Sequence, residues 1–274
     1  MSEITRRSQR EAALEVRDRM GLSEGPSRRG LGAPVRTAFF MKAPGEHPMA
    51  SLMSGRQGSG GGRGGRTRLA LLLSLIWVAS GKDHSTTRPA SFWARLLGMP
   101  DPGERGARTI NATWAELERR GFVKVQRGAH SGDVSKITLL DESASGAPYR
   151  IPTGSEGDWY IRVPENLWLA PVLAPEVTGP GLALYLVALR TYGLARNKDR
   201  LTFPAGTFHD RYGLSESTRK KGLKNLDEHL ILTRTSSVVD DFGGVGHRLR
   251  PRNTYELAPH LLPPAPRASN LPSV

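Results

Sequence analysis

Two segments of this chain open with almost the same five residues, LALLL at 69–73 and LALYL at 182–186. After each opening the same succession of patterns follows. It runs through a short apolar stretch with a turn glycine (94–99 and 209–214), a longer amphipathic stretch (113–125 and 222–234) and a closing alternating stretch (136–140 and 253–257). The repetition predicts two units, each with a helix, a short helix, a turn, a longer helix and a two-stranded hairpin.

The third helix of each predicted unit has a clear apolar face. Its members recur at helical spacing and are Ile110, Trp114 and Leu117 in the first unit and Leu223, Leu226 and Leu230 in the second. Ser215 is suited to cap the second of these helices, because its hydroxyl can accept from an unpaired amide of the first turn. Gly121 is suited to the left-handed turn that ends the first helix. Leu230 occupies the corresponding position in the second unit, so the end of that helix is less defined.

The apolar run at 69–80 follows two arginines and is similar in character to the core of a secretory signal. It is too short to span a bilayer, which takes about 20 residues. A signal sequence would not recur later in the chain, so the repetition favours a buried helix. We therefore expect no membrane contact.

Composition restricts the classes of function. The chain has 39 Lys and Arg against 26 Asp and Glu, a net charge of +13 that suits an anionic partner. The absence of cysteine excludes disulfides, cysteine-ligated zinc and thiol nucleophiles. The seven histidines do not fall at metal-ligand spacing, and no catalytic motif stands out. We expect no enzyme activity, no cofactor and no metal.

The patterns divide the chain into five parts. With 31 glycines and 20 prolines, part of it is expected to stay unfolded. We predict a disordered, basic, glycine-rich arm, which is either a passive linker or a contact to phosphates. Two folded domains follow. They are joined by a linker with a short packed segment in which Trp159 and Trp168 join the core, and a disordered tail comes last. Their bounds are 1–66 for the arm, 67–142 for domain 1, 143–179 for the linker, 180–260 for domain 2 and 261–274 for the tail.

The stretch YGLSESTRKKGLKNL at 212–226 resembles the recognition helix of GntR-type regulators, whose usual pattern is Y-G-V-S-x-S-T-V-R-x-A-L-x-x-L. Arg219 departs from it, because the pattern has a buried aliphatic residue there, and the first unit has an insertion around 100–105. As a whole the chain is similar to tandem winged-helix proteins of actinobacterial genomes and plasmids. The resemblance implies a mainly α fold with small β-hairpins (α+β), two winged helix-turn-helix domains in tandem, and binding of double-stranded DNA.

In a helix-turn-helix, residues near the start of the recognition helix face the base edges. In domain 2 the candidates are Ser215, Ser217, Thr218, Arg219, Lys220, Lys221 and Lys224. Arg219 or Lys220 could read guanine, and the two short hydroxyl side chains could contact phosphate or a thymine methyl. The competing interpretation is a basic face that only contacts solvent.

Domain 1 offers a weaker set at the same place, namely Arg105, Arg108, Thr109 and Asn111. Asn111 could pair with adenine if exposed, or could simply be solvated. The hairpin of domain 2 adds Arg248, Arg250 and Arg252, which alternate and so share one side of a strand. They could follow the backbone or enter a minor groove, although Asp240 and Asp241 oppose that interpretation. We expect domain 2 to dominate affinity.

The function that we predict is sequence-specific binding of double-stranded DNA by a transcriptional regulator. We expect it in the bacterial cytoplasm, associated with the nucleoid. Two alternatives stay open: a plasmid replication initiator on origin repeats, and a winged-helix module that binds proteins without binding DNA. A homodimer or another protein partner is compatible with each of them.

Overall fold

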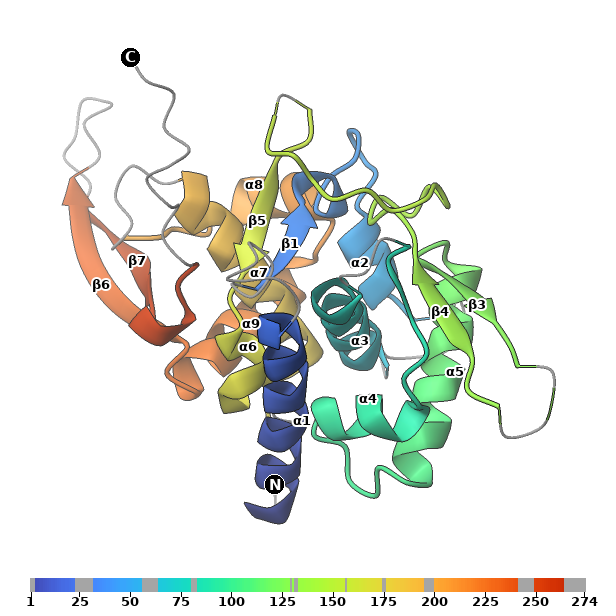
Figure 1. Cartoon of the computed structure of the whole chain (residues 1–274). Coiled ribbons are helices and arrows are strands. Elements are labelled where there is room, and N and C mark those ends of the chain that lie inside the picture. Colours follow the sequence, from blue (N-terminus) through green and yellow to red (C-terminus); the bar gives the residue numbers. More distant parts are fainter. Residues whose placement is uncertain are drawn as a thin grey trace.

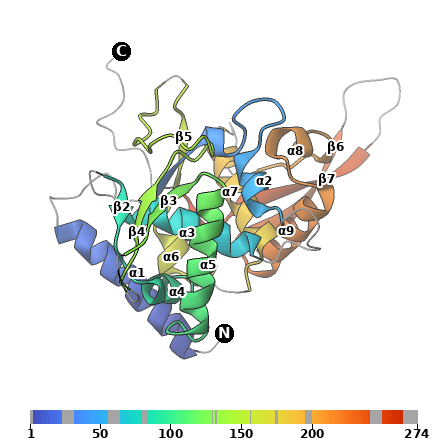
Figure 2. The same cartoon turned by 90° about the vertical axis from the view of Figure 1, so that its right-hand side faces the viewer.

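The computed structural model describes residues 3–22, 32–55, 64–79, 83–128, 130, 133–155, 157–173, 176–194, 200–240 and 249–263. These residues form a mixed α+β structure with nine α-helices and seven strands, the strands lying in small antiparallel sheets (Figures 1 and 2). The helices are α1 (Glu3–Leu22), α2 (Pro48–Met53), α3 (Gly65–Val78), α4 (Ala90–Leu96), α5 (Arg105–Arg119), α6 (Asn166–Leu169), α7 (Gly179–Leu194), α8 (Ala205–Tyr212) and α9 (Glu216–Glu228). The strands are β1 (Ala33–Arg36), β2 (Ser85–Thr86), β3 (Val123–Gln126), β4 (Lys136–Leu139), β5 (Tyr160–Val163), β6 (Leu232–Asp240) and β7 (Leu249–Leu257).

The two repeated apolar runs lie at the centre of the molecule. They are α3 and α7, which contact each other and are buried on almost every side (Figure 1). A helix that is apolar all round needs such a place, because any face turned to water would lose the free energy of burial. The two hairpins, β3–β4 and β6–β7, lie on opposite sides of this centre in Figure 1.

The N-terminal region is ordered wherever the structure describes it, so the predicted disordered arm over residues 1–66 is wrong. Helix α1 packs against α4 and α6 and buries Ala12, Ala13 and Val16. Those side chains are small, which lets α1 approach its neighbours closely but leaves only a weak hydrophobic signal in the sequence. The glycine-rich stretch at 56–63 and the predicted tail from 264 onward lie outside the described residues.

Strand β1 of the same N-terminal region completes a sheet with a distant strand. It pairs antiparallel with β5, with Ala33 opposite Val163 and Arg36 opposite Tyr160. The short packed segment predicted before the second unit therefore exists as β5 and α6, and its strand also pairs with the N-terminal region. Trp168 is buried as predicted, but Trp159 is 58% exposed, so its predicted place in the core is wrong.

The two repeats have the same order of elements. The first runs α3, β2, α4, α5, β3 and β4, and its sheet has the order β2–β4–β3. The second runs α7, α8, α9, β6 and β7, and a bridge from Leu201 to Tyr255 on β7 takes the place of β2. The predicted helices and hairpin strands are thus all present. The first repeat adds a short strand, β2, and the second adds a single bridge at Leu201, and the sequence predicted neither.

The third helices of the two repeats end in the same hydrogen-bond pattern. After α5, the backbone N of Gly121 donates to Glu118 O and that of Phe122 to Leu117 O, at 2.9 and 3.0 Å. After α9, Leu230 donates to Asp227 O and Ile231 to Leu226 O, at 3.1 and 2.9 Å. The residues at the turn have φ of +77° and +55°. The second helix therefore ends as the first does, with leucine in a left-handed conformation that suits glycine.

A buried charged cluster joins β1 to the segment after β4. Arg36 donates from Nη1 to Glu142 Oε2 at 2.6 Å and from Nε to Asp158 Oδ1 at 2.7 Å, and Asp141 Oδ2 lies 3.7 Å from Nη1. Glu142 is fully buried. Burial raises its pKa to about 7, and the nearby carboxylate of Asp141 adds to this rise, whereas Arg36 opposes it. This cluster fixes the N-terminal region to the rest of the fold.

No helix in the described part of the chain combines the length and the apolar character needed to cross a membrane.

Candidate nucleic-acid interface

Helix α9 begins with the cap that the sequence predicts. Ser215 Oγ accepts a hydrogen bond from the backbone N of Thr218 at 3.2 Å and lies 2.9 Å from Thr218 Oγ1. Ser217 is exposed and Thr218 is half-buried. Because the cap is neutral, it satisfies one amide without cancelling the positive end of the helix dipole. The first turn of α9 also holds the carboxylate of Glu216, and the three cations that follow, Arg219, Lys220 and Lys221, outnumber it.

Arg219 is held by the protein and is only 15% exposed. Its Nε and Nη2 donate to the two carboxylate oxygens of Glu216 at 2.7 and 2.6 Å, and its Nη1 donates to Phe203 O at 2.8 Å. The hydrogen bonds from Arg219 lower the pKa of Glu216, so this carboxylate stays ionised and neutralises the guanidinium. The structure thus ties Arg219 to the segment before α8, away from the exposed side of α9.

Three lysines project from the exposed side of α9. Lys220 and Lys224 have side chains that are 71% and 78% exposed, and Lys221 is exposed as well. Lys220 Nζ lies 3.6 Å from Glu216 Oε1, and Lys224 Nζ lies 3.7 Å from Glu228 Oε1. Such exposed pairs contribute little free energy, so both ammonium groups can turn to a phosphate at small cost.

The start of α5 differs from the start of α9 in charge. The residues inserted before α5 form a turn in which Asp101 Oδ1 and Oδ2 each lie 3.3 Å from a backbone N, those of Glu104 and Arg105. Two acidic residues thus stand at the positive end of the α5 dipole, where they oppose the approach of a phosphate. The start of α9 also has an acidic residue, Glu216, but three cations follow it, so the two helix starts differ in their balance of charge.

The predicted residues of α5 are all exposed, namely Arg105, Arg108, Thr109 and Asn111. Arg108 Nη2 lies 3.7 Å from Glu104 Oε2, and Thr109 Oγ1 donates to Arg105 O at 2.9 Å. The structure therefore brings together a second exposed set on α5, with fewer cations than the set on α9.

Of the three arginines predicted to act from the second hairpin, the structure describes the backbones of Arg250 and Arg252. Arg248 lies outside the described residues. The backbones of Arg250 and Arg252 belong to β7 and pair with Val239 and Ser237 on β6. Their strand positions agree with the predicted alternation, and the direction of their side chains is not described.

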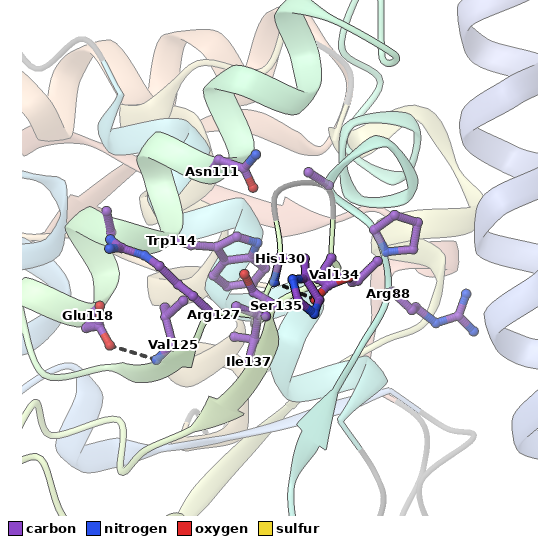
Figure 3. Close-up of a pocket in the computed structure, with 15 residues that line it drawn as sticks. Arg88, Asn111, Trp114, Glu118, Val125, Arg127, His130, Val134, Ser135 and Ile137 are labelled. Carbon is purple, nitrogen blue, oxygen red and sulfur yellow. Dashed lines mark hydrogen bonds between the residues drawn. The ribbon is translucent and has the colours of Figure 1, made fainter.

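A cleft lies between the third helix and the hairpin in each repeat. In the first repeat it has a volume of about 660 Å³, and Asn111 and Trp114 from α5 face His130 and Val134 from the hairpin (Figure 3). In the second repeat it has a volume of about 540 Å³. The second cleft is lined mainly by charged side chains, which are Arg219, Lys220, Lys224, Asp227, Glu228 and Arg234, together with Leu223, Asn253 and Tyr255.

Each cleft is closed at one end by the same carboxylate contact. Glu118 Oε1 of α5 accepts from the backbone N of Val125 at 2.7 Å, and Asp227 Oδ1 of α9 accepts from the backbone N of Arg234 at 3.2 Å. Both contacts fix the hairpin relative to the helix that precedes it. We predicted no role for Asp227 from the sequence. Comparing the two repeats position by position could have found this shared role.

Several arginines counted in the basic balance are used inside the protein. Arg66 Nε donates to Val177 O at 2.7 Å, and Arg68 Nε donates to Leu52 O at 2.7 Å. Burial lowers the pKa of both guanidinium groups. The net charge of +13 therefore overstates the positive charge that faces a partner.

Among the residues that the structure describes, no group of three or more His, Asp or Glu side chains could hold a metal ion. Comparison with known proteins finds no matching family model, no matching curated protein and no matching solved structure.

Proposed function

We propose that this chain binds double-stranded DNA sequence-specifically, without catalysis, through two winged-helix units, and that it serves as a transcriptional regulator. The order of a helix, a short strand or bridge, two further helices and a hairpin occurs twice. This order is that of a winged helix-turn-helix, in which α5 and α9 would be the recognition helices and the hairpins the wings. A recognition helix enters the major groove with its N-terminal residues toward the base edges.

The observation that carries the proposal is the exposed side of α9. It combines a neutral cap at Ser215 with Lys220, Lys221 and Lys224, while the opposite side is buried against the core. Lysines on such a face neutralise phosphates. The short side chain of Ser217 can hydrogen-bond, through its hydroxyl, to a phosphate or a base edge that lies close to the helix. Arg219 positions the helix and does not read bases in this proposal, because its guanidinium is bound to Glu216 and Phe203.

The salt dependence of binding tests the proposal. The full chain is titrated against random-sequence duplex in a gel-shift assay at several salt concentrations. If about six phosphates are contacted, the slope of log K against log salt should be about −5. Absent binding, or binding that ignores salt, would overturn the proposal and favour the protein-interaction module.

Matched variants test which unit dominates. Lys220→Ala with Lys221→Ala removes two exposed cations from α9, and Arg105→Ala with Arg108→Ala removes two exposed cations from α5. We expect the α9 pair to weaken binding about tenfold or more and to reduce the salt slope by about 2, since each phosphate contact contributes about 1. The α5 pair should have a clearly smaller effect. Equal effects would contradict the ranking, and thermal melting of both variants controls for loss of fold.

The biological role follows from where the chain binds in its genome. Pull-down of bound genomic fragments followed by sequencing should give sites at promoters. Sites confined to a replication origin would replace regulation with replication initiation, a role that the unlike charge at the starts of α5 and α9 also suits.

A further inference from the structure

We infer that the chain forms a dimer by antiparallel pairing of strand β6 with β6 of a second copy. The inference goes beyond the proposed function, because it concerns contact between two protein chains and holds with or without DNA. It depends on the backbone hydrogen-bonding groups along the hairpin β6–β7, which make one edge of the hairpin suitable for another strand and the other edge unsuitable.

The hairpin β6–β7 lies at the margin of the molecule (Figures 1 and 2). Each residue from Leu232 to Asp240 on β6 stands opposite one residue of β7, without a bulge. Nine residues in a strand span about 30 Å at roughly 3.4 Å each. The four successive residues 233–236 are all exposed, so both faces of the ribbon are in water there. A two-stranded ribbon of this kind is only marginally stable alone, so a further strand beside it would stabilise it.

The bridge to Leu201 shows which way the backbone groups of β7 point. Tyr255 N donates to Leu201 O, and Leu201 N donates to Tyr255 O, both at 2.9 Å. Both polar backbone groups of Tyr255 therefore face Leu201 and not β6. Arg234 stands opposite Tyr255, so its own backbone groups also point away from the partner strand. In agreement, Arg234 N donates to Asp227 Oδ1 at 3.2 Å, outside the hairpin.

The direction of these groups alternates along a strand, so Ser236 and Val238 also turn their backbone N and O atoms to the outer edge of β6. Among the strands that the structure describes, only β7 pairs with β6. The outer edge therefore offers a row of donors and acceptors in a strand whose sequence contains neither lysine nor proline. Edge strands that avoid pairing with other chains are usually short, bulged or protected by such residues.

The outer edge of β7 is much less suited to pairing. Pro251 stands opposite Val238, so it occupies an outward-facing position and has no N–H to donate there. The backbone groups of Tyr255 are already bound to Leu201. The other edge strands of the described sheets, β1, β2, β3 and β5, have at most four residues each. Within the described part of the chain, β6 is thus the long strand whose edge can accept another strand.

A second copy of β6 is the occupant that matches this edge. Two copies related by a two-fold axis pair antiparallel through the same residues on both sides, so each edge supplies the groups that the other needs. With the axis at Ser237, Ser236 of one chain stands opposite Val238 of the other, and Arg234 opposite Asp240. Both pairs join residues that face the edge, and the second pair joins opposite charges, which favours this register. Because the edge of β7 does not accept a strand, assembly stops at two chains.

The experiment measures the mass of the full chain by size-exclusion chromatography with light scattering, at several concentrations and without DNA. We expect twice the 29.9 kDa of one chain. A single-chain mass at every concentration, or a mass that grows beyond two chains, would overturn the inference. Because DNA is absent, this result is independent of the gel-shift result that tests the proposed function.

Two proline variants at one cross-strand pair locate the interface. Ser236 and Asn253 stand opposite each other, and both turn their N–H groups away from the hairpin. Ser236→Pro should raise the dissociation constant of the dimer about tenfold or more, since one hydrogen bond is lost on each side of the two-fold axis. Asn253→Pro, the matched control, removes a donor from the β7 edge and should leave the dimer intact. A dimer that survives Ser236→Pro, or that dissociates equally in both variants, would contradict pairing through β6.

A charge exchange tests the register and does not require the hairpin to tolerate proline. Arg234→Asp places like charges opposite each other in the dimer and should weaken it severalfold. Combining it with Asp240→Arg should restore the dimer, because opposite charges then face each other again across the axis. Positions 234 and 240 lie about 20 Å apart along one strand, so this recovery cannot come from within a chain. Failure of the double variant to recover the dimer would overturn the proposed pairing.

Discussion

Two neighbouring cations of α9 have different surroundings, although a helical pattern treats both as polar. Lys220 extends into solvent, whereas Arg219 reaches back to Phe203 O and Glu216. The planar guanidinium can bind a carboxylate and a carbonyl at the same time, which a single ammonium does less well. We therefore expect Arg219 to affect mainly the stability of the fold and Lys220 to affect mainly DNA binding.

Replacing Arg219 by alanine removes the hydrogen bonds that tie α9 to the segment before α8. We expect Arg219→Ala to lower the free energy of unfolding by roughly 1.5–3 kcal/mol, the range for a hydrogen bond that involves a charged group. Lys220→Ala, the matched control, should stay within about 0.5 kcal/mol of the parent chain. Urea unfolding measures both. Equal losses in the two variants would contradict the assigned role of Arg219.

The buried carboxyl of Glu142 should make stability depend on pH near neutrality. Its pKa is about 7 in the folded chain against an ordinary value of 4.5. A pKa raised by folding contributes stability that is complete below pH 4.5 and is lost as the pH rises through 7. The free energy of unfolding should therefore fall between pH 5 and pH 8, by roughly 2–3 kcal/mol at about 1.4 kcal/mol per pKa unit.

Glu142→Gln isolates this contribution, because it removes the titrating proton and keeps an oxygen for Arg36. Urea unfolding of the variant at pH 5, 6, 7 and 8 should lack the decline seen in the parent chain. Burial by itself would raise the pKa of Asp158, but hydrogen bonds from Thr153 and Arg36 lower it, so its own contribution is lost only in acid and does not enter this window. A decline of equal size in the variant would show that other groups cause it.

Among the elements, α9 ends in a turn whose backbone conformation is less favourable for its residue than that of the turn after α5. Leu230 has φ of +55° and is 74% exposed. A leucine in the left-handed region is disfavoured by roughly 1–2 kcal/mol, and its exposed side chain recovers little through packing. We expect Leu230→Gly to raise the free energy of unfolding by about 1 kcal/mol, as measured by chemical denaturation.

Gly121 is the matched control for this prediction, because it occupies the same turn after α5. Gly121→Ala should destabilise the chain by about 1 kcal/mol, since φ there is +77° and a Cβ would lie 3.2 Å from Ala144 O. Stabilisation by Gly121→Ala, or destabilisation by Leu230→Gly, would mean that the two turns are not equivalent.

At the scale of the whole molecule, the two repeats should unfold together. They share one hydrophobic core, and Phe39 and Phe40 join them from a region outside both repeats. Calorimetry should therefore give one transition with equal calorimetric and van't Hoff enthalpies. Two separate transitions would show that the shared core does not couple the repeats.

Phe40→Ala provides the variant for the same measurement. It removes a buried ring that packs against Tyr212, so the melting temperature should fall. The second repeat should then unfold at a lower temperature than the first. A broadened or divided transition is the expected result. An unchanged, equally sharp transition at the parent temperature would show that this contact does not join the repeats.

The sequence by itself determined the features that depend on local patterns: the repeat, the buried face of α5, the cap at Ser215 and the turn at Gly121. The predicted face of α9 is confirmed at Leu223 and Leu226 and wrong at Leu230, which lies beyond the helix and is 74% exposed. Spacing of apolar residues and the φ preference of glycine are readable within a few positions of the chain. Only the tertiary structure decided which cations face outward and that the region before α3 is part of the core. Three arginines bind groups that lie elsewhere in the chain: Arg36 binds Glu142, Arg66 binds Val177 O and Arg219 binds Phe203 O. Strand β1 pairs with a strand that lies beyond the first repeat. Such partners are brought together by long-range packing, which no local pattern records.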